Sequence, residues 1–243
     1  MTPLLKLRDV TKRFDGLVAV NQMGFDIEKG EVVGLLGPNG SGKTTLINLI
    51  SGALAPTLGS IRINGRDIAG KRPDVIARAG IARTFQLVRI LPSMSVLENA
   101  RVPAAFGVKS HWGSDIDRIA MDCLNLVGLV DMADAMPGEL TYIDQKRLEL
   151  ARALAAEPEV LLLDEWLAGL NPTELQTGIA LIKTLQSTGL TILLVEHIME
   201  AVRALCPRCV VMNAGALIAD GSTEEVLANP SVISAYLGEG HDA

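Results

Sequence analysis

The sequence predicts an α/β fold with a mostly parallel core sheet. Short apolar runs alternate with amphipathic segments of helix length, which is the pattern of strand–helix–strand units. The runs at 160–163 and 192–195 are apolar at every position, as expected for strands buried on both faces. The run at 60–64 instead alternates apolar and polar residues and meets Asn64-Gly65, a two-residue hairpin signal. A small antiparallel β layer is therefore expected near the amino end.

The expected elements follow in order along the chain. The amino-terminal part contains a strand at 31–36, a helix at 43–51 and the hairpin strands 60–64 and 66–68. From 95 to 155 helical spacing dominates and is broken by Pro and Gly. After Pro158 the alternation resumes, with strands at 160–163, 191–195, 209–212 and 216–219. One helix begins at Pro172, a second ends at Leu205, and two short helices follow the last strand.

These patterns predict one domain over residues 1–243. At roughly 150 residues per domain, a chain of 243 residues suits one large domain with a smaller lobe inserted. We expect residues 1–86 and 158–243 to form the core lobe and residues 87–157 to form a helical lobe inserted into it. No repeat or low-complexity linker separates the two.

Composition excludes several functional classes. Although 49% of the residues are hydrophobic, no apolar run approaches the roughly 18 residues of a membrane-spanning helix. The net charge of −6, from 22 Lys+Arg and 28 Asp+Glu, argues against nucleic acid as a partner. Residues 1–10 lack the features of a secretion signal, so the three cysteines are expected to be reduced thiols in the cytosol.

Residues 37–44, Gly-Pro-Asn-Gly-Ser-Gly-Lys-Thr, match the phosphate-binding pattern G-x-x-x-x-G-K-[ST]. The pattern lies between a predicted strand and a predicted helix, and this context disfavours an ordinary glycine-rich turn. Backbone N–H groups would bind phosphate, Lys43 would bridge the β- and γ-oxygens of ATP, and Thr44 would bind Mg²⁺. The predicted nucleotide-binding residues are Gly37, Pro38, Asn39, Gly40, Ser41, Gly42, Lys43, Thr44 and Thr45. The expected fold is therefore a P-loop NTPase.

Two acidic residues end the apolar run at 160–163. Asp164 could hold Mg²⁺ through water, and Glu165 could orient or polarise the attacking water. Taken alone, the pair could be the solvent-facing end of a strand, but a phosphate loop requires a second, acidic site for its metal. Asp164 is therefore a candidate metal ligand, and Glu165 is a candidate catalytic residue.

The order of these motifs resembles that of the ATP-binding subunits of ABC transporters over essentially the whole chain. The matching segments are 10–14 (Val-Thr-Lys-Arg-Phe), 83–86 (Arg-Thr-Phe-Gln), 140–154 (a signature and its helix), 168–172 (Ala-Gly-Leu-Asn-Pro) and 193–197 (Leu-Leu-Val-Glu-His). The resemblance implies that Phe14 stacks on adenine, Gln86 contacts Mg²⁺ or the lytic water, and His197 hydrogen-bonds the γ-phosphate. On residue type alone, His197 could cap a helix and Phe14 could be a core aromatic.

In this family two subunits close face to face, so the resemblance implies that the signature contacts ATP held by the partner. The signature residues are Thr141, Tyr142, Ile143 and Asp144. Ile143 stands where the family has glycine, and Trp166 stands where proline usually follows the catalytic glutamate. A β-branched Ile143 would obstruct close approach to phosphate. We therefore expect retained ATP binding with weakened or asymmetric hydrolysis.

Within the family, segments 80–86, 95–99 and 168–172 and the ending Ala235-Tyr236-Leu237-Gly238 most resemble the ATPases of branched-chain amino-acid importers. Such importers contain two different ATPase chains, two membrane subunits and an external solute-binding protein. The resemblance implies a peripheral ATPase at the cytoplasmic face of the inner membrane, bound to transmembrane permease subunits. The transported solute stays open, as does the choice between a homodimer and a heterodimer with a sister ATPase.

Two other functional classes match part of the pattern. A soluble regulatory or nucleic-acid-associated ABC ATPase would be favoured by tandem nucleotide domains, coiled-coil insertions or a basic face, and the sequence has none of these. A phosphate-loop kinase would need a lid for its acceptor and has no use for Glu165 or His197. Cys206-Pro207-Arg208-Cys209 matches C-x-x-C without a second ligand pair, which favours buried or reduced thiols over a zinc or redox site.

Overall fold

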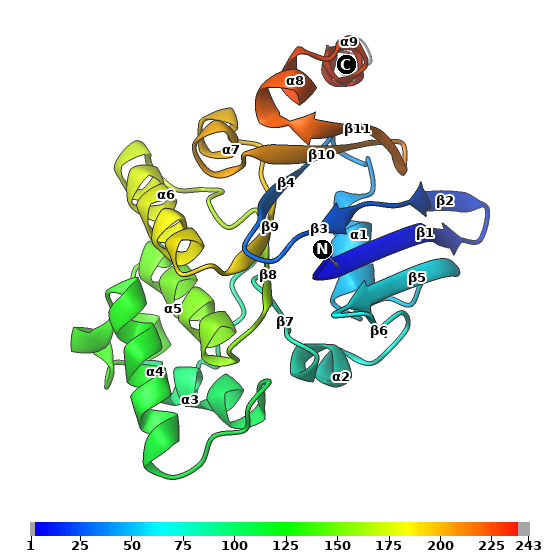
Figure 1. Cartoon of the computed structure of the whole chain (residues 1–243). Helices are drawn as coiled ribbons and strands as arrows, with labels where there is room; N and C mark the ends of the chain where they lie inside the picture. The colour runs from blue at the N-terminus through cyan, green and yellow to red at the C-terminus, as the bar shows by residue number, and fades with distance from the viewer. Residues whose placement is uncertain (1–2, 238–243) are drawn as a thin grey trace.

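Two β-sheets organise the computed structural model of the chain, which describes residues 3–237 (Figure 1). Met1 and Gly238 lie outside the described residues. Met1 begins the segment that is expected to lack a secretion signal, and Gly238 ends the segment 235–238 that resembles importer ATPases. In the larger sheet five strands run parallel and the edge strand β11 is antiparallel. Its spatial order is β11 (Ala216–Ser222), β10 (Arg208–Asn213), β4 (Val32–Leu36), β9 (Thr191–Val195), β8 (Val160–Asp164) and β7 (Ile81–Arg83). The expected mostly parallel core sheet is confirmed.

The smaller sheet is antiparallel and forms from the amino-terminal residues. Its spatial order is β2 (Leu17–Met23), β1 (Leu5–Phe14), β5 (Leu58–Ile63) and β6 (Arg66–Asp67), and β3 (Asp26–Ile27) pairs with β1. The β5–β6 hairpin turns at Asn64 and Gly65, whose φ angles of 50° and 77° are the two left-handed positions that such a turn needs. The expected antiparallel layer is therefore confirmed.

Helices cover both faces of the larger sheet and form a bundle at one side (Figure 1). Their bounds are α1 (Lys43–Ile50), α2 (Pro73–Arg78), α3 (Val96–Phe106), α4 (Ser114–Val127), α5 (Tyr142–Ala155), α6 (Pro172–Ser187), α7 (Met199–Leu205), α8 (Thr223–Ala228) and α9 (Pro230–Leu237), with the 3-10 helices η1 (Val130–Met132) and η2 (Pro137–Glu139). Within residues 3–237 none of them has both the length and the apolar character that a membrane span requires. The bundle of α3, α4 and α5 falls inside segment 87–157, while the two-lobe division itself stays a prediction.

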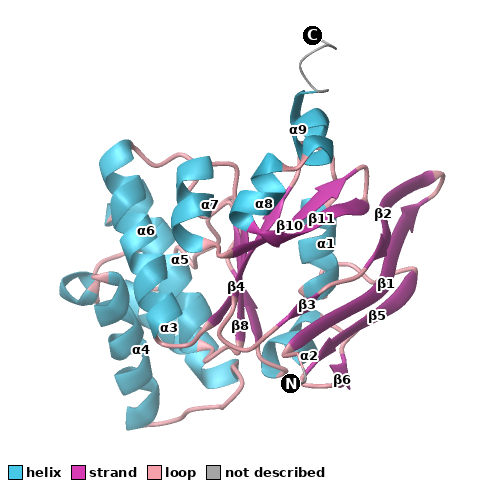
Figure 2. Cartoon of the chain, turned by 45° about the horizontal axis from the view of Figure 1, so that its top comes forward, coloured by secondary structure: helices cyan, strands magenta, loops and turns pink. Residues whose placement is uncertain are grey.

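The central strands of the larger sheet contain continuous apolar runs because both faces of the sheet are covered. In β9, Ile192 and Leu194 pack into one core cluster with residues of α5, α6 and α7. Leu193 and Val195 point the other way, into a second cluster with α1 and the antiparallel layer. Figure 2 shows α1 between the two sheets. Since successive side chains alternate between two buried faces, no polar residue interrupts the run 192–195.

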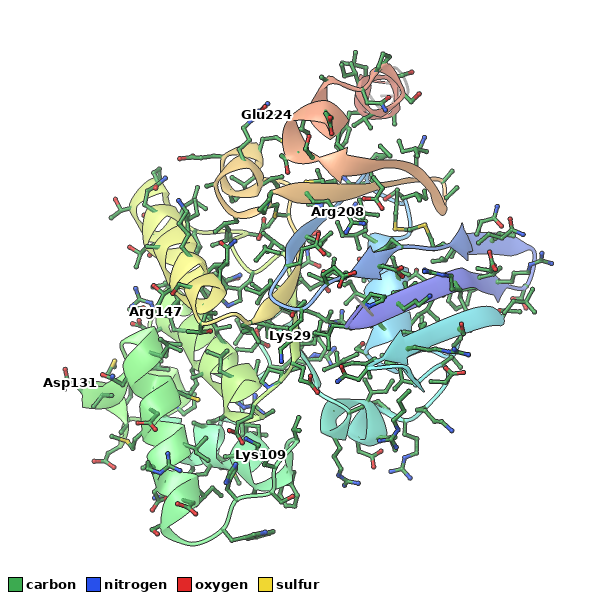
Figure 3. All side chains as sticks on the ribbon, viewed as in Figure 1. Lys29, Lys109, Asp131, Arg147, Arg208 and Glu224 are labelled. Atoms are coloured by element: carbon green, nitrogen blue, oxygen red, sulfur yellow. The ribbon has the colours of Figure 1, made fainter. Side chains whose placement is uncertain are left out.

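Arg208 connects the edge of the larger sheet to the antiparallel layer through ion pairs and a backbone hydrogen bond. Arg208 of β10, labelled in Figure 3, donates to Asp220 of β11 at 2.6 Å and to Glu31 at 3.0 Å. It also donates to the backbone oxygen of Asp26 in β3. The hydrogen bonds to Asp220 and Glu31 raise the pKa of Arg208, with Asp220 contributing more. The edge that carries β10 and β11 is therefore held by a charged cross-link as well as by strand pairing.

Candidate nucleotide site

The phosphate loop joins β4 to α1, and its glycines allow it to pack closely. Gly37 and Gly42 have φ angles of 146° and 102°, in the region that favours glycine. A Cβ on Gly37 would lie 2.2 Å from the backbone oxygen of Met212, and one on Gly42 would lie 2.3 Å from that of Ala19. The loop therefore lies directly against β10 and β2, and no larger residue can replace either glycine without a shift of backbone.

Lys43 begins α1 and is buried, with its ammonium group inside the loop. Its Nζ donates to the backbone oxygens of Gly37 at 2.7 Å and Pro38 at 2.8 Å. Thr44 is exposed at the same helix end. The predicted phosphate-binding residues thus gather at the amino end of a helix, where unpaired N–H groups and the helix dipole favour an anion.

An aromatic side chain stands beside the loop on the antiparallel layer. Phe14 ends β1, is 39% exposed, and borders a pocket of about 460 Å³ together with Gly40 and Thr45. Lys12 holds its Nζ 5.0 Å from the centre of the Phe14 ring. Phe14 is therefore not a core residue, and its ring is available to stack on a flat ligand next to the loop.

The three predicted catalytic side chains meet at the carboxyl end of β8. Gln86 Nε2 donates to Glu165 Oε2 at 2.7 Å, and His197 Nε2 lies 3.0 Å from Glu165 Oε1. When Glu165 is ionised it can only accept, so His197 carries the proton on Nε2 and donates it. Gln86 follows β7 and His197 follows β9, the two strands that flank β8. Parallel strands end at one edge of the sheet, and this brings the three residues together.

The segment after β8 has a constrained backbone. Glu165 has a φ of 50°, which is uncommon for a residue with a Cβ, and its N–H donates to the Val195 oxygen at 2.9 Å. Two residues later, the Leu167 N–H donates to the buried carboxylate of Glu196 at 2.8 Å. Burial raises the pKa of Glu196 to about 7, although N–H groups of Leu167 and His197 oppose the shift. Glu196, which belongs to the matching segment 193–197 but had no expected role, thus helps to fix the Glu165 segment.

Asp164 is paired with a buried arginine. Arg83 Nη2 lies 2.7 Å from Asp164 Oδ2, and the two side chains are only 9% and 5% exposed. Arg83 Nη1 also donates to Asn48 Oδ1 at 2.6 Å and to Ser51 Oγ at 3.2 Å, so it connects β8 to the carboxyl end of α1. The sequence signals no separate role for Arg83, because its partner lies 81 positions away and no local pattern marks the pair.

The predicted signature residues form the amino end of α5. Thr141 is the N-cap: its Oγ1 accepts from the Asp144 N–H at 3.3 Å and donates to Asp144 Oδ2 at 2.6 Å. Thr141 and Tyr142 are exposed. Ile143 has ordinary helical backbone, so no left-handed conformation requires a glycine there. A carboxylate therefore already occupies the helix end at which the resemblance places a partner's phosphate.

A reciprocal pair of hydrogen bonds joins the signature helix to the residue after Glu165. Lys146 Nζ donates to the Trp166 oxygen at 2.9 Å, and Trp166 Nε1 donates to the Lys146 oxygen at 3.1 Å. Both side chains are buried, and Lys146 Nζ lies 5.2 Å from the centre of the Tyr142 ring. Trp166, which stands where the resemblance predicts proline, thus connects the helix of the predicted signature to the Glu165 segment.

The C-x-x-C cysteines lie away from these motifs, in the core. Cys206 and Cys209 are free, buried thiols that pack against β4. A Cβ on Gly34 would lie 2.9 Å from Cys209 Sγ and 3.2 Å from Cys206 Sγ. Across the part of the chain that the structure describes, no group of three His, Cys, Asp or Glu residues is arranged to hold a metal.

A phosphate loop at the start of α1, an acidic pair at the carboxyl end of β8 and a histidine after β9 define a P-loop ATPase of the ABC class. The family model described as ABC transporter matches residues 20–168, and the chain belongs to this family. A second model, described as branched-chain amino acid ATP-binding cassette transporter, matches residues 216–242. The predicted family and enzymatic class are therefore confirmed.

Relatives and solved structures match over nearly the whole chain. BraF of Pseudomonas aeruginosa, a high-affinity branched-chain amino acid transport ATP-binding protein, is 41% identical and covers 98% of each chain. LivG of Escherichia coli, with the same description, is 40% identical and also covers 98% of each. MJ1267, an ATP-binding cassette of an ABC transporter in its ADP conformation, has a TM-score of 0.87 at 29% identity and covers 98% of this chain and 100% of its own. These relatives favour a transport ATPase over the regulatory or nucleic-acid-associated alternative.

Proposed function

We propose that the chain is the ATP-binding and hydrolysing subunit of an importer for branched-chain or related amino acids. The observation that carries this proposal is the contact of Gln86 and His197 with the two oxygens of Glu165, at the sheet edge that also carries the phosphate loop. The relatives BraF and LivG are named as branched-chain amino acid transport ATP-binding proteins. Membrane subunits and an external binding protein would select the solute.

The oxygen donors of this site suit Mg²⁺. Thr44 offers a hydroxyl, Asp164 a carboxylate and Gln86 an amide oxygen, and Mg²⁺ prefers oxygen ligands. Arg83 engages Oδ2 of Asp164, which leaves Oδ1 to face a metal or its water. These three residues would hold the ion, which when bound neutralises charge on the β- and γ-phosphates.

Glu165 would orient the water that attacks the γ-phosphate. Its carboxylate accepts a hydrogen bond from that water and polarises it, while Gln86 and His197 restrict rotation of the carboxylate. Lys43 would move its ammonium group from the loop carbonyls to the phosphate oxygens, because a charged acceptor makes a stronger hydrogen bond than a neutral one. Phe14 would stack on adenine at the other end of the nucleotide.

The signature residues would act on ATP bound to a second ATPase chain. Thr141 and Tyr142 face solvent at the end of α5, where another chain can approach them. The solved structure of the bacterial ABC transporter cassette MJ0796 is dimeric, with a TM-score of 0.80 to this chain at 28% identity, covering 90% of this chain and 98% of its own. The partner here would be a second copy or a sister ATPase.

A groove between the core sheet and the α3–α5 bundle offers a docking place for a permease subunit. It has a volume of about 500 Å³ and is bordered by Arg83, Phe85, Arg89, Pro103, Glu149 and Arg152, among others. The buried Glu149 accepts from the backbone N–H groups of Phe85 and Arg89 at 3.3 and 2.8 Å, so α5 holds the segment around Gln86. A membrane subunit docked here would keep the chain at the cytoplasmic face of the inner membrane.

Transport activity is tested in proteoliposomes that contain this chain, its membrane subunits and the external binding protein. Leucine uptake is expected to require internal ATP and to fall to background with Lys43→Ala, because that variant lacks the cation that bridges the phosphates. A matched Lys109→Ala variant, which removes an exposed lysine of the helical side, should transport normally. Uptake that continues with Lys43→Ala would contradict the proposal.

Replacing Ile143 by Gly should raise the ATPase rate of the assembled transporter. The side chain lies in the first turn of α5, beside the helix end that would meet the partner's phosphate. Removing it should allow closer approach and raise the rate on the order of 3- to 10-fold. Ile116→Gly in α4 controls for the loss of helix propensity. An unchanged rate would show that Ile143 does not weaken hydrolysis.

A further inference from the structure

We propose that Tyr236 of α9 is a positioning residue for the phosphate loop: its hydroxyl fixes the N–H of Gly37 and keeps the loop in its phosphate-binding shape. The inference rests on the proposed role of that loop in ATP binding. Tyr236 belongs to the importer-like ending, which the hydrolysis mechanism above does not use, and to the segment matched by the second family model.

The contact joins two residues that are 199 positions apart in the sequence. The Gly37 N–H donates to the Tyr236 hydroxyl oxygen at 2.8 Å. Gly37 is buried, so its N–H needs an acceptor inside the protein. Other N–H groups of the loop are expected to bind phosphate. The Gly37 N–H instead donates to α9 and holds the first glycine of the loop in place.

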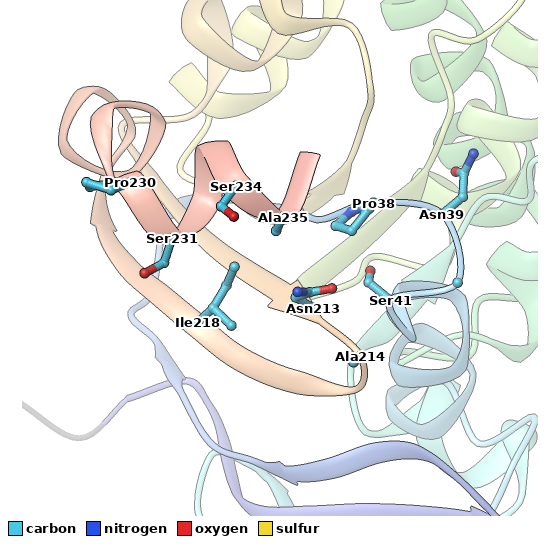
Figure 4. Close-up of a pocket in the computed structure, with 11 residues that line it drawn as sticks. Pro38, Asn39, Ser41, Asn213, Ala214, Ile218, Pro230, Ser231, Ser234 and Ala235 are labelled. Carbon is cyan, nitrogen blue, oxygen red and sulfur yellow. The ribbon is translucent and has the colours of Figure 1, made fainter. Parts of the chain in front are cut away.

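The rest of the loop stands apart from α9 across a pocket. The pocket has a volume of about 790 Å³, and Figure 4 shows Pro38 and Ser41 of the loop on one side and Ser234 and Ala235 of α9 on the other. Polar and apolar side chains border it, among them Ser231, Ile218 and Pro230, and open space rather than tight packing separates this part of α9 from the loop. A specific hydrogen bond is therefore needed to transmit the position of α9 to the loop.

The ring and the hydroxyl of Tyr236 have separate tasks. Val232, one turn earlier on the same face of α9, is buried, and the Tyr236 ring packs against the same core cluster. Leu237 lies on the outer face and is 70% exposed. Tyr236→Phe keeps the packed ring and removes the hydroxyl, and with it the acceptor for the Gly37 N–H. Leu237→Ala instead shortens a neighbouring side chain that faces solvent.

Loss of the acceptor should weaken ATP binding without changing the chemical step. A buried N–H without a partner disfavours the folded loop. The apparent Kd is inversely proportional to the fraction of chains that have the binding-competent loop, so it rises when that fraction falls. A single hydrogen bond of ordinary strength corresponds to about a 3- to 10-fold change in such an equilibrium. The side chains of Glu165, Gln86 and His197 are untouched, so kcat should stay within about twofold.

The experiment compares wild type, Tyr236→Phe and Leu237→Ala by calorimetric titration with MgATP, by ATPase kinetics, and by amide hydrogen exchange at Gly37. Tyr236→Phe is expected to raise Kd and KM about 3- to 10-fold and to speed Gly37 exchange by a similar factor, while Leu237→Ala matches wild type. Equal Kd and equal Gly37 exchange in wild type and Tyr236→Phe would overturn the inference, and so would equal effects of the two variants. A wild-type chain that binds no MgATP would overturn the proposed function instead, and Gly37 exchange would still decide the role of Tyr236.

Discussion

Replacing Glu165 by Gln is expected to slow ATP hydrolysis by about 100-fold or more while MgATP still binds. Glutamine keeps the size of the side chain and can still meet Gln86 and His197, but its amide cannot take a proton from the attacking water. The rate is measured as phosphate release at saturating ATP. Glu200→Gln makes the same chemical change at an exposed carboxylate of α7 and should leave the rate unchanged.

The same variant reports on pairing of the ATPase chains. If two chains close around ATP and hydrolysis reopens them, Glu165→Gln should accumulate as an ATP-bound dimer in size-exclusion chromatography with light scattering. Adding Lys43→Ala should abolish that dimer, because the double variant lacks the lysine expected to bind the phosphates. A Glu165→Gln chain that binds ATP and stays monomeric would rule out self-pairing and favour a sister ATPase. Wild-type hydrolysis by the variant would remove Glu165 from the mechanism.

Replacing Arg83 by Met is expected to lower the free energy of unfolding by about 3–5 kcal/mol. The substitution leaves the Asp164 carboxylate in a buried site without its cation, and it also removes the donors to Asn48 and Ser51. A buried charge without a partner costs much more than the pair contributes, so the loss should exceed that of an ordinary core substitution. Urea denaturation followed by circular dichroism measures the effect.

Arg8 provides the matched control for this change. It pairs with Asp26 at 2.6 Å, almost the same distance as in the Arg83 pair, but the two side chains are 42% and 34% exposed. Water screens such a pair, so Arg8→Met should cost at most about 1 kcal/mol. If both variants unfold at the same urea concentration, burial of the Arg83–Asp164 pair does not matter for stability.

Much of the fold could be predicted because its signals are local. Two opposite buried faces make β4, β8 and β9 apolar at successive positions, and left-handed Asn64 and Gly65 mark the hairpin. The phosphate loop is also local, since its residues are contiguous and its pattern is long. The roles of Gln86 and His197 came from their order along the chain, because neither residue is informative on its own. The structure places both against Glu165, and their roles stay predictions.

By itself, the sequence determined the α/β class, the nucleotide loop and the candidates Asp164 and Glu165. Only the tertiary structure decided which distant side chains support them: Arg83 pairs with Asp164, Trp166 binds Lys146, and Tyr236 holds the Gly37 N–H. The physical reason is that a turn or a periodic strand is specified by neighbouring residues. A buried polar group, in contrast, takes whatever partner the order of strands and helices brings within hydrogen-bond distance.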